Sequence, residues 1–473
     1  MLIIPANSAS ASGYAVDNSC RFDDGSSDYL SRTPASAGNR RTWTWSGWVK
    51  RSQIGGTYNN LFSAGTDSDT NGFVQCAFWG DSSDWLEVTI YNSAYLRFRT
   101  TQLFRDTSAW YHIVIGFDST QGTNTNRVKI YVNGEQISSF ATYNTLAQNF
   151  DSAVNNTEIQ KVGAGSSSAS SVNNYYDGYI AEAVLVDGQQ LAADSFGEFD
   201  EDSGIWKPID VSGLTFGTNG FYLDFEDSAA LGDDVSGNGN DFTVNNLTAI
   251  DQTTDTPTNN FATWNPLVHY STSATFSEGN LKVAPTENTS VNYTTSTIAM
   301  PQSGKWYAEF KKLQNDNRLA VGIIDTDLQT GIFQANSYLK DVVAGGIMYD
   351  SINGKISGNN GDIQTSLTAA GNNAIIGLAV DMDNQLFYVY VDGSLINTGG
   401  SGASFSYLTG THAAFWVGDV ATSGYDNCEA NFGNPPFSIS SGNADGNSRG
   451  NFEYLPPSGF LSLCTANLSE VLS

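Results

Sequence analysis

Two short stretches of this sequence combine aromatic rings with amide and carboxylate side chains, the combination that protein sites use to hold sugars. The apolar face of a sugar packs on an aromatic ring, while Asn and Asp side chains at the rim hydrogen-bond the hydroxyl groups. FWGDSSDW spans residues 78–85 and SSVNNYYDG spans residues 170–178. The candidate glycan-binding residues are Trp79, Asp84, Trp85, Asn174, Tyr175 and Tyr176. Surface aromatics also form oligomer interfaces, and strand aromatics usually belong to the core, so both alternatives stay open.

A second candidate site, for a metal ion, is the segment DDVSGNGND at residues 233–241. Carboxylate and amide oxygens in a flexible loop suit Ca²⁺, which takes about six to eight oxygen ligands. The candidate ligands are Asp233, Asp234, Asn238, Asn240 and Asp241. The spacing is not that of an EF-hand, and the same residues also form turns, because Asn, Asp and Gly tolerate positive φ. Calcium is therefore a possible ligand, a turn series is the favoured alternative, and no other cofactor is expected.

Residues for nucleophilic or redox chemistry are few and widely spaced. The three histidines, His112, His269 and His412, are far apart, and no Ser/His/Asp or Cys/His motif accompanies them. His112 lies in the apolar run WYHIVIGF, where we expect a hydrogen-bonded or outward-facing side chain. The four cysteines form no C-x-x-C pair, so we expect buried free thiols, with Cys20–Cys76 and Cys428–Cys464 bridges as unsupported alternatives.

The charge of the chain excludes one large class of partner. The formal net charge is −28 over 473 residues, whereas nucleic-acid binding needs clustered Lys and Arg. No run approaches the ~18 apolar residues of a membrane span, and the N-terminus lacks the basic start of a signal peptide. We therefore expect neither nucleic-acid binding nor membrane insertion.

The elements that would position these residues are β-strands. Short alternating apolar runs are joined by Gly-, Asn- and Ser-rich turns, and no helical periodicity extends beyond about three turns. TWTWSGWVKR, at 42–51, has aromatic bulk on both faces, which is typical of a strand covered on both sides in a sandwich. KIYVNGEQI (129–137) and FYVYVDGSLI (387–396) each predict a hairpin with a type I′ turn at Asn-Gly or Asp-Gly.

The order of these runs predicts an all-β protein with two antiparallel jelly-roll sandwiches in tandem. We expect an N-terminal arm over residues 1–20 and the first sandwich over 21–199. A connector with one or two strands, at 200–265, leads to the second sandwich at 266–437 and a C-terminal extension at 438–473.

Several of these runs resemble known families. FDDGSSDYLSR (22–32), TWSGWVKR, the WYHIVIGF run and KIYVNGEQI resemble the concanavalin A-like, laminin-G-like lectin/glucanase superfamily. GKWYAEF (304–310), IIGLAVDMDN (375–384) and NFGNPPF (431–437) are similar to a SPRY-type sandwich. The connector and the ending LPPSGFLSLCTANL resemble those of structural proteins of marine tailed phages.

The phage resemblance implies a virion protein, assembled in the host cytoplasm and exposed on the particle. Its role would be that of a tail fibre or fibre-like appendage that attaches to host-surface polysaccharide and contacts other virion proteins. The resemblance further implies a homo-oligomer, with a trimer favoured, although no heptad or β-helix repeat demands one. The alternatives are a capsid decoration or head-fibre protein, and a glycan-degrading hydrolase.

The hydrolase alternative lacks its expected residues. Laminarinase-type members of the superfamily carry E-x-D-x-x-E on one strand, with its carboxylates serving as nucleophile, helper and acid/base. The nearest match here is EFDEDS, in which Glu198 and Asp200 fit but position 203 is Ser. We therefore expect a non-enzymatic protein with no catalytic residues.

Overall fold

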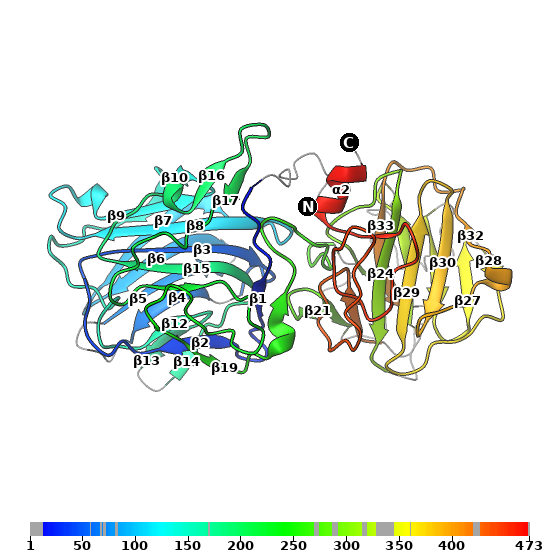
Figure 1. Cartoon of the computed structure of the whole chain (residues 1–473), viewed down its shortest axis with the longest axis horizontal. Coiled ribbons are helices and arrows are strands. Elements are labelled where there is room, and N and C mark those ends of the chain that lie inside the picture. The colour runs from blue at the N-terminus through cyan, green and yellow to red at the C-terminus, as the bar shows by residue number, and fades with distance from the viewer. Residues whose placement is uncertain are drawn as a thin grey trace. The chain divides into compact units, whose positions relative to one another are not determined.

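The computed structural model divides the chain into two compact units, the first ending at Thr258 and the second beginning at Asn259 (Figure 1). The structure describes residues 13–56, 58–66, 69, 72–80, 84–168, 171–268, 274–285, 292–314, 319–327, 345–359, 361–419 and 426–471. Most of the expected N-terminal arm and His269 lie outside these residues. No helix in the described part of the chain is both long and apolar enough to cross a bilayer.

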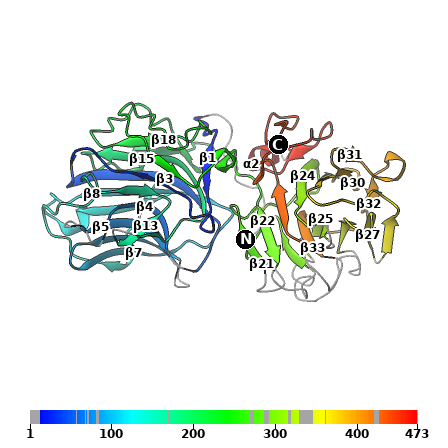
Figure 2. The same cartoon turned by 90° about the horizontal axis from the view of Figure 1, so that it is seen from below.

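The first unit is a sandwich of two eight-stranded sheets, seen as separate layers in Figure 2. The β3 sheet has the spatial order β10 (Glu135–Gln136), β9 (Val128–Val132), β8 (Trp110–Asp118), β3 (Thr42–Arg51), β15 (Gly178–Asp187), β1 (Ser19–Phe22) and β20 (Gln252–Thr253), and β18 (Phe221–Leu223) also pairs with β15. The β6 sheet has the order β11 (Phe140–Tyr143), β7 (Tyr95–Leu103), β6 (Trp85–Tyr91), β5 (Phe73–Trp79), β4 (Asn59–Gly65), β12 (Gln160–Val162), β2 (Tyr29–Arg32) and β19 (Thr243–Asn245).

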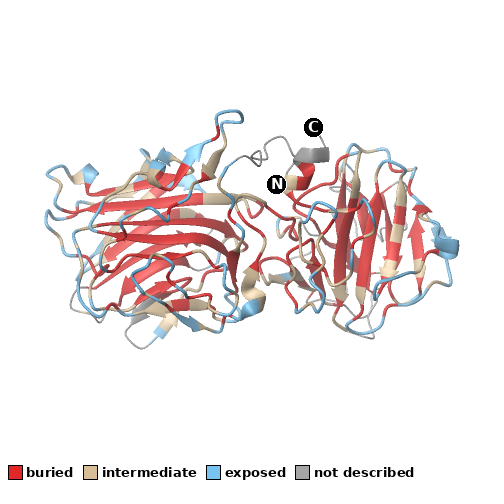
Figure 3. Cartoon of the chain, viewed as in Figure 1, coloured by how far each residue is buried: buried red, intermediate tan, exposed pale blue. Residues whose placement is uncertain are grey.

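Alternation along the strands separates a core face from an outer face in each sheet. On β3, Trp43, Trp45 and Val49 pack in the core between the sheets. Trp48 points to the other face, where it packs with Val16 and Ala181. The prediction that this strand is covered on both sides is confirmed, and Figure 3 shows the buried strands at the centre of the unit.

Residues 200–258, most of the expected connector (200–265), contribute strands to both sheets of the first sandwich. β18 pairs with β15, β20 pairs with β1, and β19 pairs with β2 at the edge of the β6 sheet. These strands are only two or three residues long, so their periodicity is too short to read from the sequence. Phe221 and Leu223 of β18, and Phe242 directly before β19, belong to the same core as Trp45.

The second unit is also an antiparallel β-sandwich. Its β24 sheet has the order β21 (Ala274–Ser277), β22 (Lys282–Pro285), β34 (Cys428–Asn431), β24 (Lys305–Lys312), β29 (Ile375–Asp381), β30 (Leu386–Val391) and β31 (Ser394–Leu395), with β32 (Ala403–Ser404) on β30. Its β25 sheet has the order β23 (Asn292–Thr295), β33 (Ala413–Asp419), β25 (Leu319–Asp325), β26 (Gly346–Asp350), β27 (Lys355–Gly358) and β28 (Gly361–Gln364). The chain is therefore all-β, with two jelly-roll sandwiches in tandem.

The described part of the expected C-terminal extension (438–473), residues 438–471, packs on this second sandwich. β35 (Leu461–Ser462) pairs in parallel with β24, and Leu463 and Leu468 lie in the core of the unit. Leu468 comes from the short helix α2 (Thr465–Val471), and Ser462 is held by hydrogen bonds to the Asp445 carboxylate. The segment that we expected to be an extension thus completes the second core.

Both predicted hairpins are present, and their turns have the expected backbone. Asn133 and Gly134 have φ of 47° and 85°, and Asp392 and Gly393 have φ of 47° and 76°. Two successive residues with positive φ define the type I′ turn, which matches the twist of the flanking strands. The four cysteines are buried free thiols, as expected.

Gly134 provides a first testable prediction. A Cβ at this position would lie 2.4 Å from Trp206, on top of the strain that φ of +85° imposes on any L-residue. We expect Gly134→Ala to destabilise the first sandwich by about 2–3 kcal/mol in denaturant unfolding. The matched control is Gly237→Ala, where φ is +86° and no atom lies within 4 Å, so the cost falls to about 1 kcal/mol. Equal losses for the two variants would contradict a role for Trp206.

Candidate functional site

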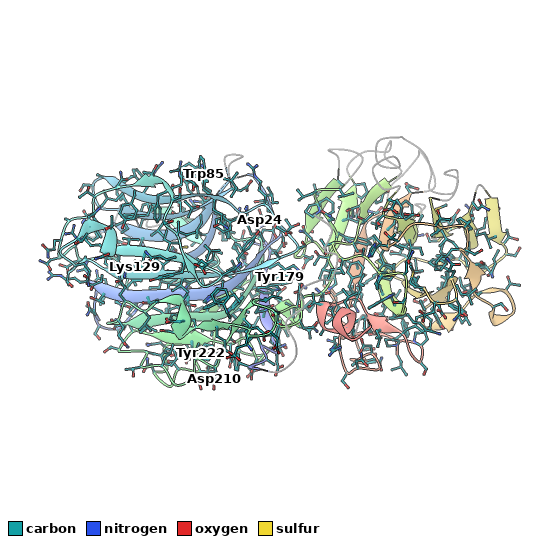
Figure 4. The ribbon with its side chains drawn as sticks, turned by 90° about the horizontal axis from the view of Figure 1, so that it is seen from above. Asp24, Trp85, Lys129, Tyr179, Asp210 and Tyr222 are labelled. Carbon is teal, nitrogen blue, oxygen red and sulfur yellow. The ribbon has the colours of Figure 1, made fainter. Side chains whose placement is uncertain are left out.

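The outer face of the β6 sheet carries the aromatic residues that the sequence marked at 78–85. On β5, β6 and β7, Phe78, Leu86 and Phe98 point into the core. Alternation therefore places Trp79, Trp85 and their neighbours on the outer face. Trp79 and Trp85 face each other directly across the β5–β6 pair. Figure 4 shows Trp85 and Tyr222 on opposite sides of the first sandwich, consistent with Trp85 lying on the outer face of the β6 sheet.

Two arginines of β7 lie over these rings. The Arg99 guanidinium carbon is 4.2 Å from the centroid of Trp79 and 4.6 Å from that of Trp85. The Arg97 guanidinium is 5.0 Å from Trp79 and 5.4 Å from Tyr95. All four distances are within the range of cation–π attraction. Tyr58 meets Trp79 edge-on, at 4.2 Å between ring centroids.

Glu87 holds the two arginines in place from the neighbouring strand. Its carboxylate accepts a hydrogen bond from Arg99 Nε at 2.5 Å and lies 3.8 Å from Arg97 Nε. Thr89 donates a third contact, at 2.6 Å. The Glu87 side chain is 1% exposed, Arg99 is 14% and Arg97 is 33%, so the arginines lie between this carboxylate and the solvent. We call the set Tyr58, Trp79, Trp85, Glu87, Arg97 and Arg99 the arginine–tryptophan platform.

Sequence reasoning missed the charged members of the platform. A signal was present, because apolar and polar residues alternate along WLEVTIY and YLRFRT. This alternation places Glu87, Arg97 and Arg99 on the same face of the sheet as Trp85. The pairing of Glu87 with Arg99 and of Thr89 with Arg97 depends on the register between β6 and β7. The sequence does not give this register. Only the fold shows that the Glu87 carboxylate lies opposite the Arg99 guanidinium.

Asp84, which we expected at the rim of a sugar site, is buried. It is 1% exposed and bonds Arg51 at 3.0 Å, Arg105 at 3.3 Å and the backbone N–H of Gly55 at 2.9 Å. Because Arg51 is itself fully buried, the carboxylate balances an internal charge. Asp84 is therefore engaged with Arg51, Arg105 and Gly55 and is not free to bind a ligand.

The second predicted cluster, at 170–178, is divided by the fold. Tyr176 is fully buried and donates a hydrogen bond to the Lys50 carbonyl, so it is a core residue and its assignment to a surface site is corrected. Tyr175 is partly exposed and contacts Tyr29 of β2, at 6.0 Å between ring centroids. The Asn174 carbonyl accepts a hydrogen bond from Asn60 of β4. Since β4 and β12 lie between β5 and β2, Tyr175 does not join the platform.

The candidate calcium loop is held by hydrogen bonds of its own. Asp234 is buried and accepts four of them, from Tyr222 N, Ser236 N and Oγ, and Asn240 N. Asn238 and Asn240 donate their amide N–H groups to the carbonyl oxygens of Gly217, Thr218 and Gly220. Asp233 and Asp241 are exposed. In the described part of the chain, no three His, Cys, Asp or Glu side chains are grouped as they would be around a metal ion.

The acidic match to a hydrolase motif forms a turn. Asp200 accepts hydrogen bonds from Ser203 and Lys207, which lower the pKa of its carboxyl to about 2. Glu198 is 3.4 Å from the same Lys207, and both acids lie at the small β16 (Gly197–Phe199) and β17 (Trp206–Pro208) hairpin. Both carboxylates are therefore engaged in the structure of this hairpin.

His112 is satisfied within the fold, as expected. The Trp206 Nε1–H donates to Nδ1 at 2.9 Å, and Ser46 Oγ lies 2.9 Å from Nε2. Burial lowers the pKa of His112 to about 3, so the ring is neutral. Because Nδ1 accepts from Trp206, the single N–H of the ring is on Nε2 and donates to Ser46 Oγ. The residue links β8 to the β16–β17 hairpin and has no free nitrogen for catalysis.

The second sandwich contains a cavity of about 490 Å³. Its lining includes the apolar side chains of Met382, Phe405 and Leu408, together with the carboxylates of Asp325 and Asp383. The twelve residues that line it contain no Lys or Arg. The cavity therefore differs in charge from the arginine–tryptophan platform.

Comparison with known proteins places the platform in a recognised domain. Residues 24–193 match the model of the concanavalin A-like lectin/glucanases superfamily. This first domain thus has a concanavalin A-like, laminin-G-like fold, and its sandwich continues beyond the match through β18, β19 and β20. No curated protein sequence matches the chain.

Solved structures are similar to the chain in fold. A putative carbohydrate-binding protein from Bacteroides ovatus is 16% identical, with 49% of this chain and 59% of that chain covered and a TM-score of 0.32. A heptameric SAP-like pentraxin from Limulus polyphemus is 14% identical, with 37% and 78% covered and a TM-score of 0.28. The SPRY domain of human HERC1 is 11% identical, with 32% and 87% covered and a TM-score of 0.25.

Proposed function

We propose that the protein is a non-enzymatic glycan-binding protein whose site is the arginine–tryptophan platform. The observation that carries this proposal is the pair Trp79 and Trp85, half-buried on the outer face of a lectin-type sandwich and bordered by hydrogen-bonding charged groups. Partly exposed aromatic rings next to fixed polar groups are the usual components of sugar sites. Two observations favour a binding protein over the hydrolase alternative: position 203 is Ser in place of the third carboxylate, and Asp200 accepts four hydrogen bonds within its own hairpin.

The biological setting that we propose is host attachment by a virion appendage such as a tail fibre. It is supported by the resemblance of the connector and of the C-terminal segment to those of phage structural proteins. Weak sugar contacts, multiplied by the copies in an oligomer, would give firm adhesion. A capsid decoration protein would instead bind the capsid without affinity for glycans, and a hydrolase would release reducing ends from a polysaccharide.

The test is binding of the full-length protein to cell-envelope polysaccharides of candidate marine bacterial hosts. We expect saturable binding that falls about 10-fold or more in Trp85→Ala, because central aromatic residues dominate binding energy. Phe199→Ala is the matched control, since Phe199 is an exposed aromatic (47%) outside the platform. Binding without EDTA and its loss with EDTA would assign calcium to the 233–241 loop. Release of reducing ends, or equal loss in both variants, would refute the proposal.

A further inference from the structure

Building on the proposed glycan site, we infer that its ligand is an acidic saccharide, one that carries carboxylate or sulfate groups. Three observations on the arginine–tryptophan platform lead to this class of ligand: the way in which the rings are covered, the balance of charge, and the state of the Arg99 guanidinium.

An arginine covers one face of each tryptophan ring, a face on which a neutral sugar could otherwise stack. Arg99 lies over both Trp79 and Trp85, and Arg97 lies over Trp79 from the same strand. A ligand that approaches this side of the rings meets guanidinium groups first. Guanidinium groups offer several N–H donors in a planar fork that matches carboxylate and sulfate oxygens. The geometry therefore favours an anionic group over the apolar face of a sugar.

The platform also has more positive than negative charge. Two arginines share the single carboxylate of Glu87, and Arg97, at 3.8 Å, is the more distant and more exposed of the two. The excess is unusual in a chain whose formal net charge is −28. A positive patch on an acidic protein steers anions toward it, while the rest of the surface repels them.

The Arg99 guanidinium is only partly compensated. Its Nε bonds Glu87, whereas its Nη2 is buried and has no hydrogen-bond partner among the described residues. A guanidinium that shares its carboxylate with a second arginine and leaves one N–H group without an acceptor still attracts an anion bound nearby, because the surrounding rings lower the local dielectric. The cavity of the second sandwich, with Asp325 and Asp383 in its lining, would repel the same ligand.

The experiment uses the full-length protein and matched polysaccharides: alginate, polygalacturonate and a sulfated galactan, each with its carboxyl-reduced or desulfated counterpart. We expect binding to the charged polymers to exceed binding to their neutral counterparts by about 10-fold or more, and to weaken as salt is added. Carboxylated and sulfated polymers are tested separately, so a comparison of their binding shows which anionic group the protein prefers.

Variants connect the effect to the platform. Arg97→Gln should weaken binding to the charged polymer about 10-fold, whereas Glu87→Gln should strengthen it. Lys129→Gln makes the same change of charge on β9 of the opposite sheet and should have no effect. Equal binding to charged and neutral polymers would overturn the acidic class but keep the glycan site. Binding to none of the polymers would overturn both proposals.

Discussion

Replacing Asp255 with alanine is expected to destabilise the first sandwich by about 3–5 kcal/mol, although the residue lies far along the chain in a segment of linker-like composition. Its carboxylate bonds Lys50 Nζ at 2.7 Å and Trp110 Nε1 at 3.0 Å, and both charged side chains are 1% exposed or less. Removal of the carboxylate would take away the negative charge that balances the buried Lys50 ammonium in this ion pair. Chemical denaturation of the first sandwich, followed by tryptophan fluorescence, measures the loss.

The control for this prediction is the same change at an exposed ion pair. Asp151 bonds Arg41 at 2.7 Å, but their side chains are 47% and 44% exposed, so Asp151→Ala should cost less than about 1 kcal/mol. The double variant Lys50→Met, Asp255→Ala should recover much of the stability, because it removes both buried charges. If Asp255→Ala proves as mild as Asp151→Ala, the buried Lys50–Asp255 pair does not hold this segment on the first sandwich.

The second large effect expected is a dependence of stability on pH that arises from Glu182. This residue is 5% exposed, has φ of +51° at a bulge of β15, and accepts hydrogen bonds from Tyr222 at 2.7 Å and from Tyr14 at 3.3 Å. Burial is the main cause that raises the pKa of its carboxyl to about 7, and Asp224 and Glu226 add to it. The folded state therefore holds the proton more firmly than the unfolded chain does.

The sign of the effect follows from linkage. A carboxyl whose folded pKa is raised stabilises the protein fully below its unfolded pKa, near 4.5, and this contribution is lost as the pH rises through about 7. The difference between the two values corresponds to about 3 kcal/mol. In the second sandwich, burial also raises the pKa of Glu309 to about 7 and that of Asp426 to about 6, so both contribute in the same direction.

The measurement is the free energy of unfolding of the first sandwich between pH 4.5 and pH 8. We expect the free energy of unfolding of the native protein to fall as the pH rises. Glu182→Gln should make this fall about 3 kcal/mol smaller, because the amide keeps an acceptor for Tyr222 but does not titrate. Glu198→Gln, at a carboxyl that is 58% exposed, is the control and should keep the slope of the native protein. A slope unchanged by Glu182→Gln would show that this carboxyl does not titrate in the range.

The sequence alone determined the class of fold and several of its elements. The alternation in TWTWSGWVKR indicated a strand with two covered faces, and β3 has the same bounds, Thr42–Arg51. Asn133-Gly134 and Asp392-Gly393 indicated two type I′ turns, because positive φ at consecutive positions is a local property of these residue pairs. Signals of this kind extend over a few residues and do not depend on the rest of the chain.

The tertiary structure alone decided which polar and aromatic residues share a surface. Asp84 and Tyr176 are of residue types that are common in sugar sites, yet packing buries both. Trp79 and Trp85 remain partly exposed. Arg97, Arg99 and Glu87 join them because the register of β6 and β7 sets their charges opposite one another. The strands of 200–258 could not be read either, since two or three residues show no period, and only their neighbours in the sheets identify them. Exposure and cross-strand pairing are relations between distant segments, and for that reason the site could be read only from the folded chain.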